Sequence, residues 1–415
     1  MKRKYIDLLN SLKVTASTLV FTIIFSGCAQ PLPQREAVPD WPTYGGNLQQ
    51  TNSHNSTITP PLEIFWELDI DIPITTAAVA GNGLIYVAAE QFFYALDPQD
   101  GEVVWFYEAS APIRTSATLF RLDKDGPGCL AFSQENSHLL CFNAESGELI
   151  WEYHEPQLNQ QGFSNPIFAA GRLYFTYSRP EAFRSIHRLA ALNAHTGEPV
   201  WDTQTQMAIH TPLFAFESIL GGTPGGTSPR FISHDASDGA TEWVAFPEDI
   251  NFAGVYSNFG VIDFDIQAGP ARLYTSNGAD PVDLRALNPV SGETLWALSL
   301  NQDFPTTGYA LTQNRDFNHL IVSNLRGLCS IVPETGLIRW QRDIETKDQK
   351  PLIWGEYIFV ALRIAGSPLQ AIHLGTGEIS WTSAPMNLST PPIIAGDSLI
   401  VGSSSGILYA LREAQ

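Results

Sequence analysis

The chain has 415 residues, of which 44% are hydrophobic and 16% are charged, so it can bury a large core and is too apolar to be disordered. Its formal net charge is −20 at pH 7. A surface this acidic repels phosphate backbones and anionic headgroups, which argues against nucleic acid and anionic lipid surfaces as partners.

An export signal is predicted over residues 1–27. The basic start Lys2-Arg3-Lys4 precedes an apolar run from Val14 to Phe25, which is too short to span a bilayer as a helix. The small residues Ser26-Gly27 then precede Cys28. This ending resembles a bacterial lipoprotein signal, and the resemblance implies that Cys28 carries acyl chains that hold the protein at a membrane.

Residues 28–60 are predicted to form a tether and an N-terminal extension. Residues 29–40 are rich in proline and polar side chains, which is typical of a linker. Without residues 1–27, the chain keeps 19 basic and 42 acidic residues, so the exported protein stays strongly acidic.

One phrase recurs along the rest of the chain and ends in tryptophan. Its seven copies lie at 95–105, 141–151, 191–201, 233–243, 286–296, 330–340 and 371–381. Every copy has glycine four residues before the tryptophan, and five copies have Asp or Asn eight residues before it; Val332 and His373 are the exceptions. An Asx side chain starts a turn and glycine supplies a positive φ, so each phrase predicts a β-hairpin.

These hairpins predict an all-β fold, an eight-bladed β-propeller of four-stranded antiparallel blades over residues 61–415. A second hairpin precedes each phrase, and the apolar period is two, which excludes a helical solenoid. The tryptophans recur at the blade interval of about 40–45 residues, and each large ring can pack against the neighbouring sheet. The markers are Trp66, Trp105, Trp151, Trp201, Trp243, Trp296, Trp340 and Trp381.

The two ends of the propeller have complementary deficits. Trp66 has no Asx-Gly turn before it, and the C-terminal Tyr409-Ala410-Leu411 has no turn or tryptophan after it. We therefore expect the strand around Trp66 to become the outermost strand of the last blade and to close the ring. A seven-bladed ring, with the repeat at 205–250 collapsed, is the alternative.

Two cysteines flank a predicted two-stranded segment. Cys129 and Cys141 would lie roughly opposite each other on adjacent strands. Outside the cytoplasm they form either a disulfide or two buried thiols.

The tryptophan phrase resembles the tryptophan-docking repeat of quinoprotein-type propellers. The segment WPTYGGNLQQTN at 41–52 is similar to the start of those propeller domains. Within this superfamily, a lipid-anchored chain of this length resembles the barrel-assembly lipoproteins of the BamB type. The resemblance implies an envelope scaffold, although the superfamily contains both enzymes and scaffolds.

No catalytic, cofactor-binding or metal-binding residue is predicted. The chain lacks the Cys-Cys pair of quinone-dependent alcohol dehydrogenases and the Cys-x-x-Cys-His motif of haem attachment. The pattern Gly402 to Gly406 matches a nucleophile elbow only formally, since no His follows it, and the nine His are scattered. The sequence therefore predicts that the protein is not an enzyme and has no cofactor.

The remaining candidates for function are surfaces. Several loops are longer than in the shortest repeats and carry aromatic residues expected to be exposed: Phe163, Phe183 and Phe304. We expect a monomeric scaffold in the cell envelope, facing the periplasm if the organism has an outer membrane, that binds envelope proteins, among them barrel-assembly subunits. The alternatives are a propeller that binds carbohydrate or another small ligand, and a quinone-dependent dehydrogenase.

Overall fold

A computed structural model describes residues 41–123, 126–156, 163–181, 184–205, 209, 212–222, 231–245, 260–263, 271–276, 283–300, 306–312, 318–347 and 349–414. The chain divides into two compact units, Met1–Arg35 and Glu36–Gln415, and all described residues lie in the second. The predicted signal, Cys28 and residues 29–40 lie outside the described residues.

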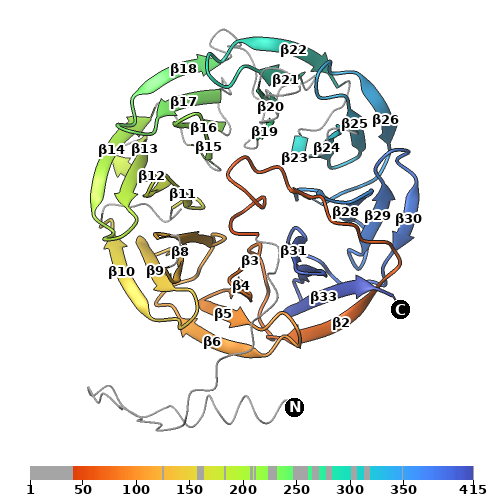
Figure 1. The fold of residues 1–415 in the computed structure, drawn as a ribbon, viewed down its shortest axis with the longest axis horizontal. Helices are drawn as coiled ribbons and strands as arrows, with labels where there is room; N and C mark the ends of the chain where they lie inside the picture. Colours follow the sequence, from red (N-terminus) through yellow and green to blue (C-terminus); the bar gives the residue numbers. More distant parts are fainter. Residues whose placement is uncertain are drawn as a thin grey trace. The chain divides into compact units, whose positions relative to one another are not determined.

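The described residues form eight antiparallel sheets and no helix, which confirms the predicted eight-bladed β-propeller (Figure 1). Blades 1 to 4 follow each other along the chain. Blade 1 is β3 (Val79–Gly81), β4 (Leu84–Ala89), β5 (Phe92–Leu96) and β6 (Val103–Glu108); blade 2 is β7 (Thr118–Arg121), β8 (Gly128–Gln134), β9 (His138–Asn143) and β10 (Leu149–His154); blade 3 is β11 (Ile167–Ala169), β12 (Arg172–Glu181), β13 (Arg184–Asn193) and β14 (Pro199–Thr205); blade 4 is β15 (Leu213–Ala215), β16 (Ser218–Gly222), β17 (Phe231–Asp235) and β18 (Thr241–Ala245).

Blades 5 to 8 complete the ring. Blade 5 is β19 (Val261–Asp263), β20 (Arg272–Ser276), β21 (Asp283–Leu287) and β22 (Thr294–Ser299); blade 6 is β23 (Thr306–Leu311), β24 (Leu320–Asn324), β25 (Leu328–Ile331) and β26 (Ile338–Arg342); blade 7 is β27 (Leu352–Trp354), β28 (Tyr357–Ala361), β29 (Leu369–His373) and β30 (Ile379–Thr382), with the short β1 (Ser53–His54) added; blade 8 is β31 (Ile393–Ala395), β32 (Ser398–Gly402), β33 (Ile407–Glu413) and β2 (Leu62–Asp69).

Blade 8 closes the ring as the sequence predicts. The N-terminal strand β2 pairs antiparallel with the last strand, β33, and is the outermost strand of that blade. Trp66 lies opposite Ala410 in this pairing. The ring is therefore closed by hydrogen bonds between the two ends of the propeller, while every other blade takes its four antiparallel strands from one continuous stretch of chain.

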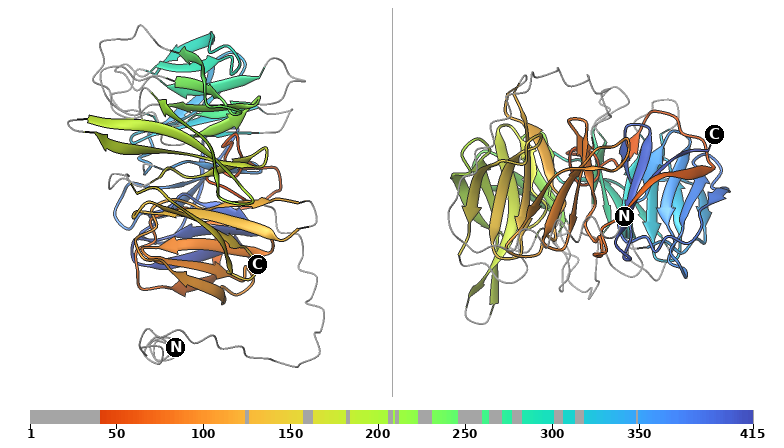
Figure 2. Two further views of the ribbon diagram at one scale, coloured as in Figure 1. Left: turned by 90° about the vertical axis from the view of Figure 1, so that its left-hand side faces the viewer. Right: turned by 90° about the horizontal axis from the view of Figure 1, so that it is seen from below.

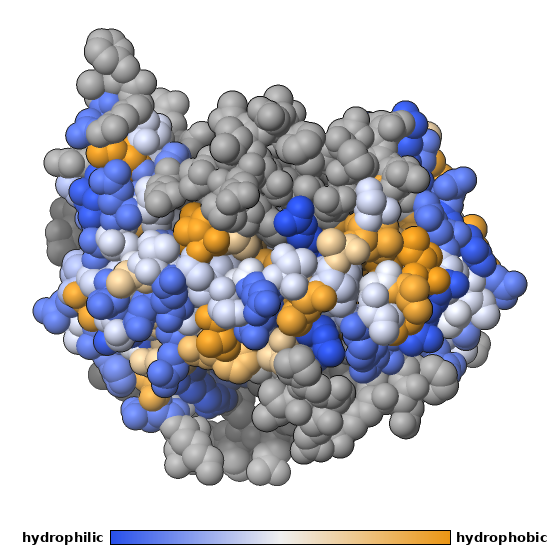
Figure 3. All heavy atoms as spheres, turned by 90° about the horizontal axis from the view of Figure 1, so that it is seen from above, coloured by the Kyte–Doolittle hydropathy of each residue, from blue (hydrophilic) through white to orange (hydrophobic). Residues whose placement is uncertain are grey.

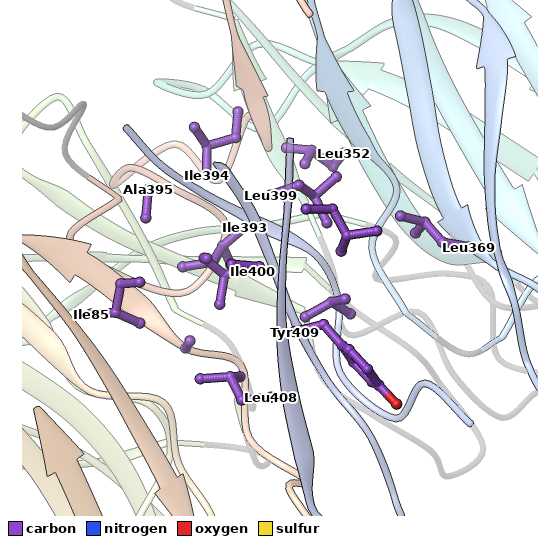
Figure 4. Close-up of a cluster of buried hydrophobic side chains, with 14 of the residues drawn as sticks. Ile85, Leu352, Leu369, Ile393, Ile394, Ala395, Leu399, Ile400, Leu408 and Tyr409 are labelled. Carbon is purple, nitrogen blue, oxygen red and sulfur yellow. The ribbon is translucent and has the colours of Figure 1, made fainter. Parts of the chain in front are cut away.

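The core lies between the blades because strands in the middle of each blade are apolar on both faces. Strand β4, for example, is buried along its whole length. Figure 4 shows one such cluster, where Ile85 of blade 1, Ile400 and Leu408 of blade 8 and Leu369 of blade 7 lie near one another. In blade 3 the hairpin β12–β13 is much longer than its counterparts and extends beyond the neighbouring strands (Figure 2).

Every repeat tryptophan except Trp381 packs on the glycine of the phrase in the next repeat, and this contact explains the phrase. A Cβ placed on Gly197 would lie 2.6 Å from the indole of Trp151, and φ at this glycine is +72°. The indole N–H of Trp151 also donates to the carbonyl of Ala194, in the same turn. The same indole-on-glycine contact occurs at Gly101, Gly147, Gly239, Gly292, Gly336 and Gly377. Glycine is needed both for its φ and because the ring leaves no room for a side chain.

Candidate functional site

The strap, residues 41–54, crosses the middle of the ring. It is the red segment at the centre of Figure 1. It starts at Trp41, which pairs with Ala80 of blade 1, and it ends at β1, which runs parallel to β27 of blade 7. Residues 41–52, which resemble the start of quinoprotein propeller domains, thus lie in the interior of the ring.

Backbone carbonyls hold the strap in place. The innermost strand of a blade is a sheet edge, so its outer N–H groups need partners. The strap supplies carbonyl acceptors to blades 1, 2, 4, 5, 6 and 7. The donor N–H and acceptor residues are Ala80 and Trp41, Leu119 and Pro42, Phe214 and Leu48, Ile262 and Gln49, Leu311 and Thr51, Ile353 and Asn52, and Gly355 and His54.

A buried lysine lies against the strap. Lys350 is only 2% exposed; its Nζ donates to Oε1 of Gln50 and lies 4.9 Å from the centre of the Tyr44 ring. Burial lowers the pKa of Lys350 to about 7. A lysine whose pKa approaches neutrality can exchange its proton near pH 7, which makes Lys350 a chemically distinctive group beside the strap.

The two cysteines of blade 2 are diagonal rather than opposite. Cys129 pairs with Asn143 across β8 and β9, and Cys141 pairs with Ala131. Both are buried and free, as is Cys329. A hydrogen bond with the Cys129 sulfur and burial raise the pKa of Cys141, so this thiol stays protonated.

Of the loop aromatics, Phe163 differs from expectation. It was expected to be exposed but is 4% exposed, and it packs edge-on against Phe175 and Tyr177 of the long β12 strand. The extended hairpin gives this ring an apolar surface that the shorter repeats lack. Phe183 and Phe304 lie outside the described side chains.

Sequence reasoning missed the strap and Lys350. The strap meets the innermost strands largely through its backbone carbonyls, which no side-chain pattern reveals. Lys350 precedes the short apolar stretch Pro351 to Trp354, and a charged residue at the entry of a buried strand was the available signal. The predicted turn at Gly402 to Gly406 does join two antiparallel strands, β32 and β33.

The described residues do not fit a quinone site of the alcohol dehydrogenase type. The chain has no adjacent cysteines. Within the described ranges, no group of three or more His, Cys, Asp or Glu is placed to hold a metal ion. The side chain of Lys350 is covered by Gln50 and Tyr44. The part of the chain that the structure describes also contains no helix with the length and apolar character of a membrane span.

The curated relative that matches this chain is a dehydrogenase. The polyvinylalcohol dehydrogenase of a Pseudomonas species is 28% identical over 166 residues, which cover 36% of this chain and 26% of that enzyme. The match thus spans about a quarter of the relative's length.

Solved structures share the fold at low sequence identity. The quinohemoprotein alcohol dehydrogenase of Comamonas testosteroni superposes with a TM-score of 0.69 at 14% identity, covering 91% of this chain and 81% of that one. BamB of Moraxella catarrhalis superposes with a TM-score of 0.61 at 16% identity, covering 85% of this chain and 100% of that one.

The prediction that the protein is not an enzyme is wrong in the light of these relatives. The matching curated relative is a dehydrogenase, and several structural neighbours are too. The prediction relied on the absent Cys-Cys pair and haem motif. Their absence excludes one arrangement of cofactor ligands, not redox chemistry as a class.

The family assignment depends on a match that spans most of the propeller. The profile of the family described as "Outer membrane protein assembly factor BamB" matches residues 63–245, 135–383 and 280–415, which together cover all eight repeats and leave out the strap. The chain therefore belongs to this family of PQQ-like β-propellers.

Proposed function

We propose that this protein is a scaffold of the cell envelope that is tethered through Cys28 and holds extended segments of other proteins during outer-membrane protein assembly. The observation that carries the proposal is an apolar rim on the outermost strands. We define the rim as the exposed residues Ile64, Phe65, Val104, Phe106, Leu149, Ile150, Val200, Leu295, Ile338 and Ile379. They lie on the outermost strands of seven blades.

The rim combines two features that recognise an extended chain. The outermost strand of each blade has no further strand beside it in the described sheets, so its edge can pair with an incoming strand. On β6, Val104 and Phe106 are both 46% exposed and lie on one face, as alternate residues do. Figure 3 shows apolar residues gathered between hydrophilic ones on one side of the molecule. Transmembrane barrel strands alternate apolar and polar residues in the same way.

In-cell photo-crosslinking tests the proposal. A photoreactive phenylalanine analogue is placed at Phe106 on the rim and, as a matched control, at Glu145 in the exposed turn of blade 2. We expect the rim position, and not the turn position, to crosslink to barrel-assembly subunits or to unfolded outer-membrane proteins in intact envelopes. Equal crosslinking at both positions, or none at the rim, would contradict the proposal.

The second candidate function is a quinone-dependent dehydrogenase, favoured by the 28% identity to the polyvinylalcohol dehydrogenase and by the shifted pKa of Lys350. Purified full chain is supplied with pyrroloquinoline quinone and Ca²⁺ and assayed for dye reduction with polyvinyl alcohol or ethanol. Reduction that depends on the quinone supports this candidate, and its absence removes it while leaving the crosslinking result intact.

A further inference from the structure

A cavity of about 320 Å³ lies beside the end of the strap, between blades 6 and 7. Its walls come from residues 53–57 at and just after the end of the strap, the end of β23 with the start of β24, and two turns of blade 7. Three imidazoles line it: His54, His319 and His373. Three histidines far apart in the sequence thus meet in one cavity of the size that small ligands occupy.

All three rings use Nδ1 for a local partner. Nδ1 of His54 accepts from the backbone N–H of Ser56 at 3.1 Å, and Nδ1 of His373 accepts from that of Thr376 at 3.2 Å. Nδ1 of His319 lies 2.7 Å from Oγ of Ser330. An imidazole whose Nδ1 accepts a hydrogen bond carries its proton on Nε2. Nε2 of His54 and Nε2 of His373 make no hydrogen bond to the described residues.

His373 also departs from the repeat in an informative way. Five repeats have Asp or Asn at this position, and Asn143 shows its role, because Oδ1 accepts from the backbone N–H groups of Glu145 and Ser146. His373 replaces that acceptor with Nδ1, which binds the equivalent N–H, of Thr376. The turn needs only one acceptor. The imidazole adds a second nitrogen, and this addition occurs in the one repeat whose turn borders the cavity.

The charges in the cavity select among ligand classes. Burial lowers the pKa of His54, and burial with Arg339 and His373 nearby lowers the pKa of His319 to about 4, so both rings are neutral at pH 7. The carboxyl-bearing Glu356 lies in the same wall. The Glu356 side chain in this wall disfavours an anionic ligand beside it, because like charges repel. In the described residues no group is arranged to bind a metal.

The remaining polar and apolar groups suit a hydroxyl-bearing ligand. Oγ of Ser53 is buried and has no hydrogen-bond partner among the residues that the structure describes. Ile353 and Leu374 add apolar wall. Neutral donors, a carboxylate acceptor and an apolar wall together match a molecule that has both hydroxyl groups and C–H faces. We propose that this cavity binds a neutral polyhydroxylated ligand of monosaccharide size, a site distinct from the rim and from Lys350.

The test uses a variant that keeps the turn intact. His373→Asn places at this position a residue that three other repeats have there, which keeps an acceptor for the turn and removes the imidazole with its Nε2. His195→Asn is the matched control, because His195 is exposed in the corresponding turn of blade 3. Purified full chain is titrated separately with glucose, galactose, mannose, ribose, glycerol, acetate, inorganic phosphate and Zn²⁺, while the imidazole proton resonances are followed by NMR.

We expect at least one neutral sugar to shift the resonances of His319 and His373 saturably. The His373→Asn variant should bind that sugar about tenfold more weakly, the loss expected for one hydrogen bond, and His195→Asn should bind it as the wild type does. If no sugar shifts these resonances, if only acetate, phosphate or Zn²⁺ does, or if both variants bind alike, the proposal is overturned. None of these outcomes depends on the rim.

Discussion

At the residue scale, the repeat glycines combine two requirements that can be separated by experiment. Gly197 and Gly171 lie in the same blade and have nearly the same φ, +72° and +75°. A Cβ on Gly197 would meet the indole of Trp151, whereas a Cβ on Gly171 would meet nothing within 4 Å. Both glycines thus have a left-handed backbone, but only at Gly197 would a side chain also clash with an indole ring.

We therefore expect Gly197→Ala to destabilise the protein more than Gly171→Ala. The backbone conformation alone costs about 1–2 kcal/mol for a residue with a Cβ, and the conflict with the indole adds about 1–3 kcal/mol of overpacking. Urea unfolding of both variants measures the difference. Equal losses of unfolding free energy would mean that the indole moves aside without cost.

Lys350 predicts a pH dependence of stability. Its folded-state pKa, about 7, is below the usual 10.5, so the unfolded chain binds more protons between these two pH values. The free energy of unfolding should therefore gain a contribution from Lys350 as pH rises from about 7 to 10.5. Lys350→Met removes this contribution. We expect a smaller rise in unfolding free energy from pH 7 to pH 10 in the variant; an unchanged rise would show that Lys350 is charged in the fold.

At the element scale, the strap should stabilise the whole ring rather than one blade. Its carbonyls accept hydrogen bonds from the innermost strands of six blades. Deleting residues 29–54, with Cys28 joined to residue 55, removes all of these bonds, each worth about 1 kcal/mol. We expect a loss of several kcal/mol in unfolding free energy.

The control for this deletion keeps the strap. Deleting residues 29–38 alone leaves every hydrogen bond of the strap in place, so we expect the unfolding free energy of this variant to match that of the full chain. If the two deletions behaved alike, the hydrogen bonds of the strap would contribute nothing to stability.

The elements differ in how far the sequence predicts them. Each tryptophan phrase predicts its hairpin because the turn and the indole contact depend on particular side chains, such as Gly197 and Trp151. The closing strand β2 is predictable because Trp66 lacks a turn that the other markers have. The path of the strap could not be predicted, because carbonyl acceptors are the same in every sequence. The cavity between blades 6 and 7 depends on this path and was missed with it, although the histidine in place of Asx at 373 marked the position.

At the scale of the whole molecule, the ring has one seam, between β2 and β33. Seven tryptophans pack on a glycine turn of the next repeat. Trp381 has no such glycine among the described residues, because the two outer strands of blade 8, β33 and β2, are far apart in the sequence and no hairpin turn joins them. It packs against the cluster of blades 1, 7 and 8 instead and remains partly exposed.

Replacing Trp66 and Trp381 compares an indole that packs on a glycine turn with one that does not. Trp66 is 9% exposed, packs on Gly101 and donates to the carbonyl of Pro98. We expect Trp66→Ala to cost about 3–5 kcal/mol, as large aromatic truncations do, and Trp381→Ala to cost less. Thermal unfolding of both variants tests this order, and a greater loss at Trp381 would contradict it.

The pairing of β2 with β33 also means that the ring can close only after β33 has been synthesised. Strand β2 belongs to the first part of the chain to be synthesised, yet its partner β33 is the last, and the strap likewise needs blade 7. An early strand with a late partner stays unpaired until the carboxyl end arrives, since no local contact can substitute for it. The newly made chain must therefore keep an open sheet edge throughout its production, and it would need protection from aggregation until the final strand is released.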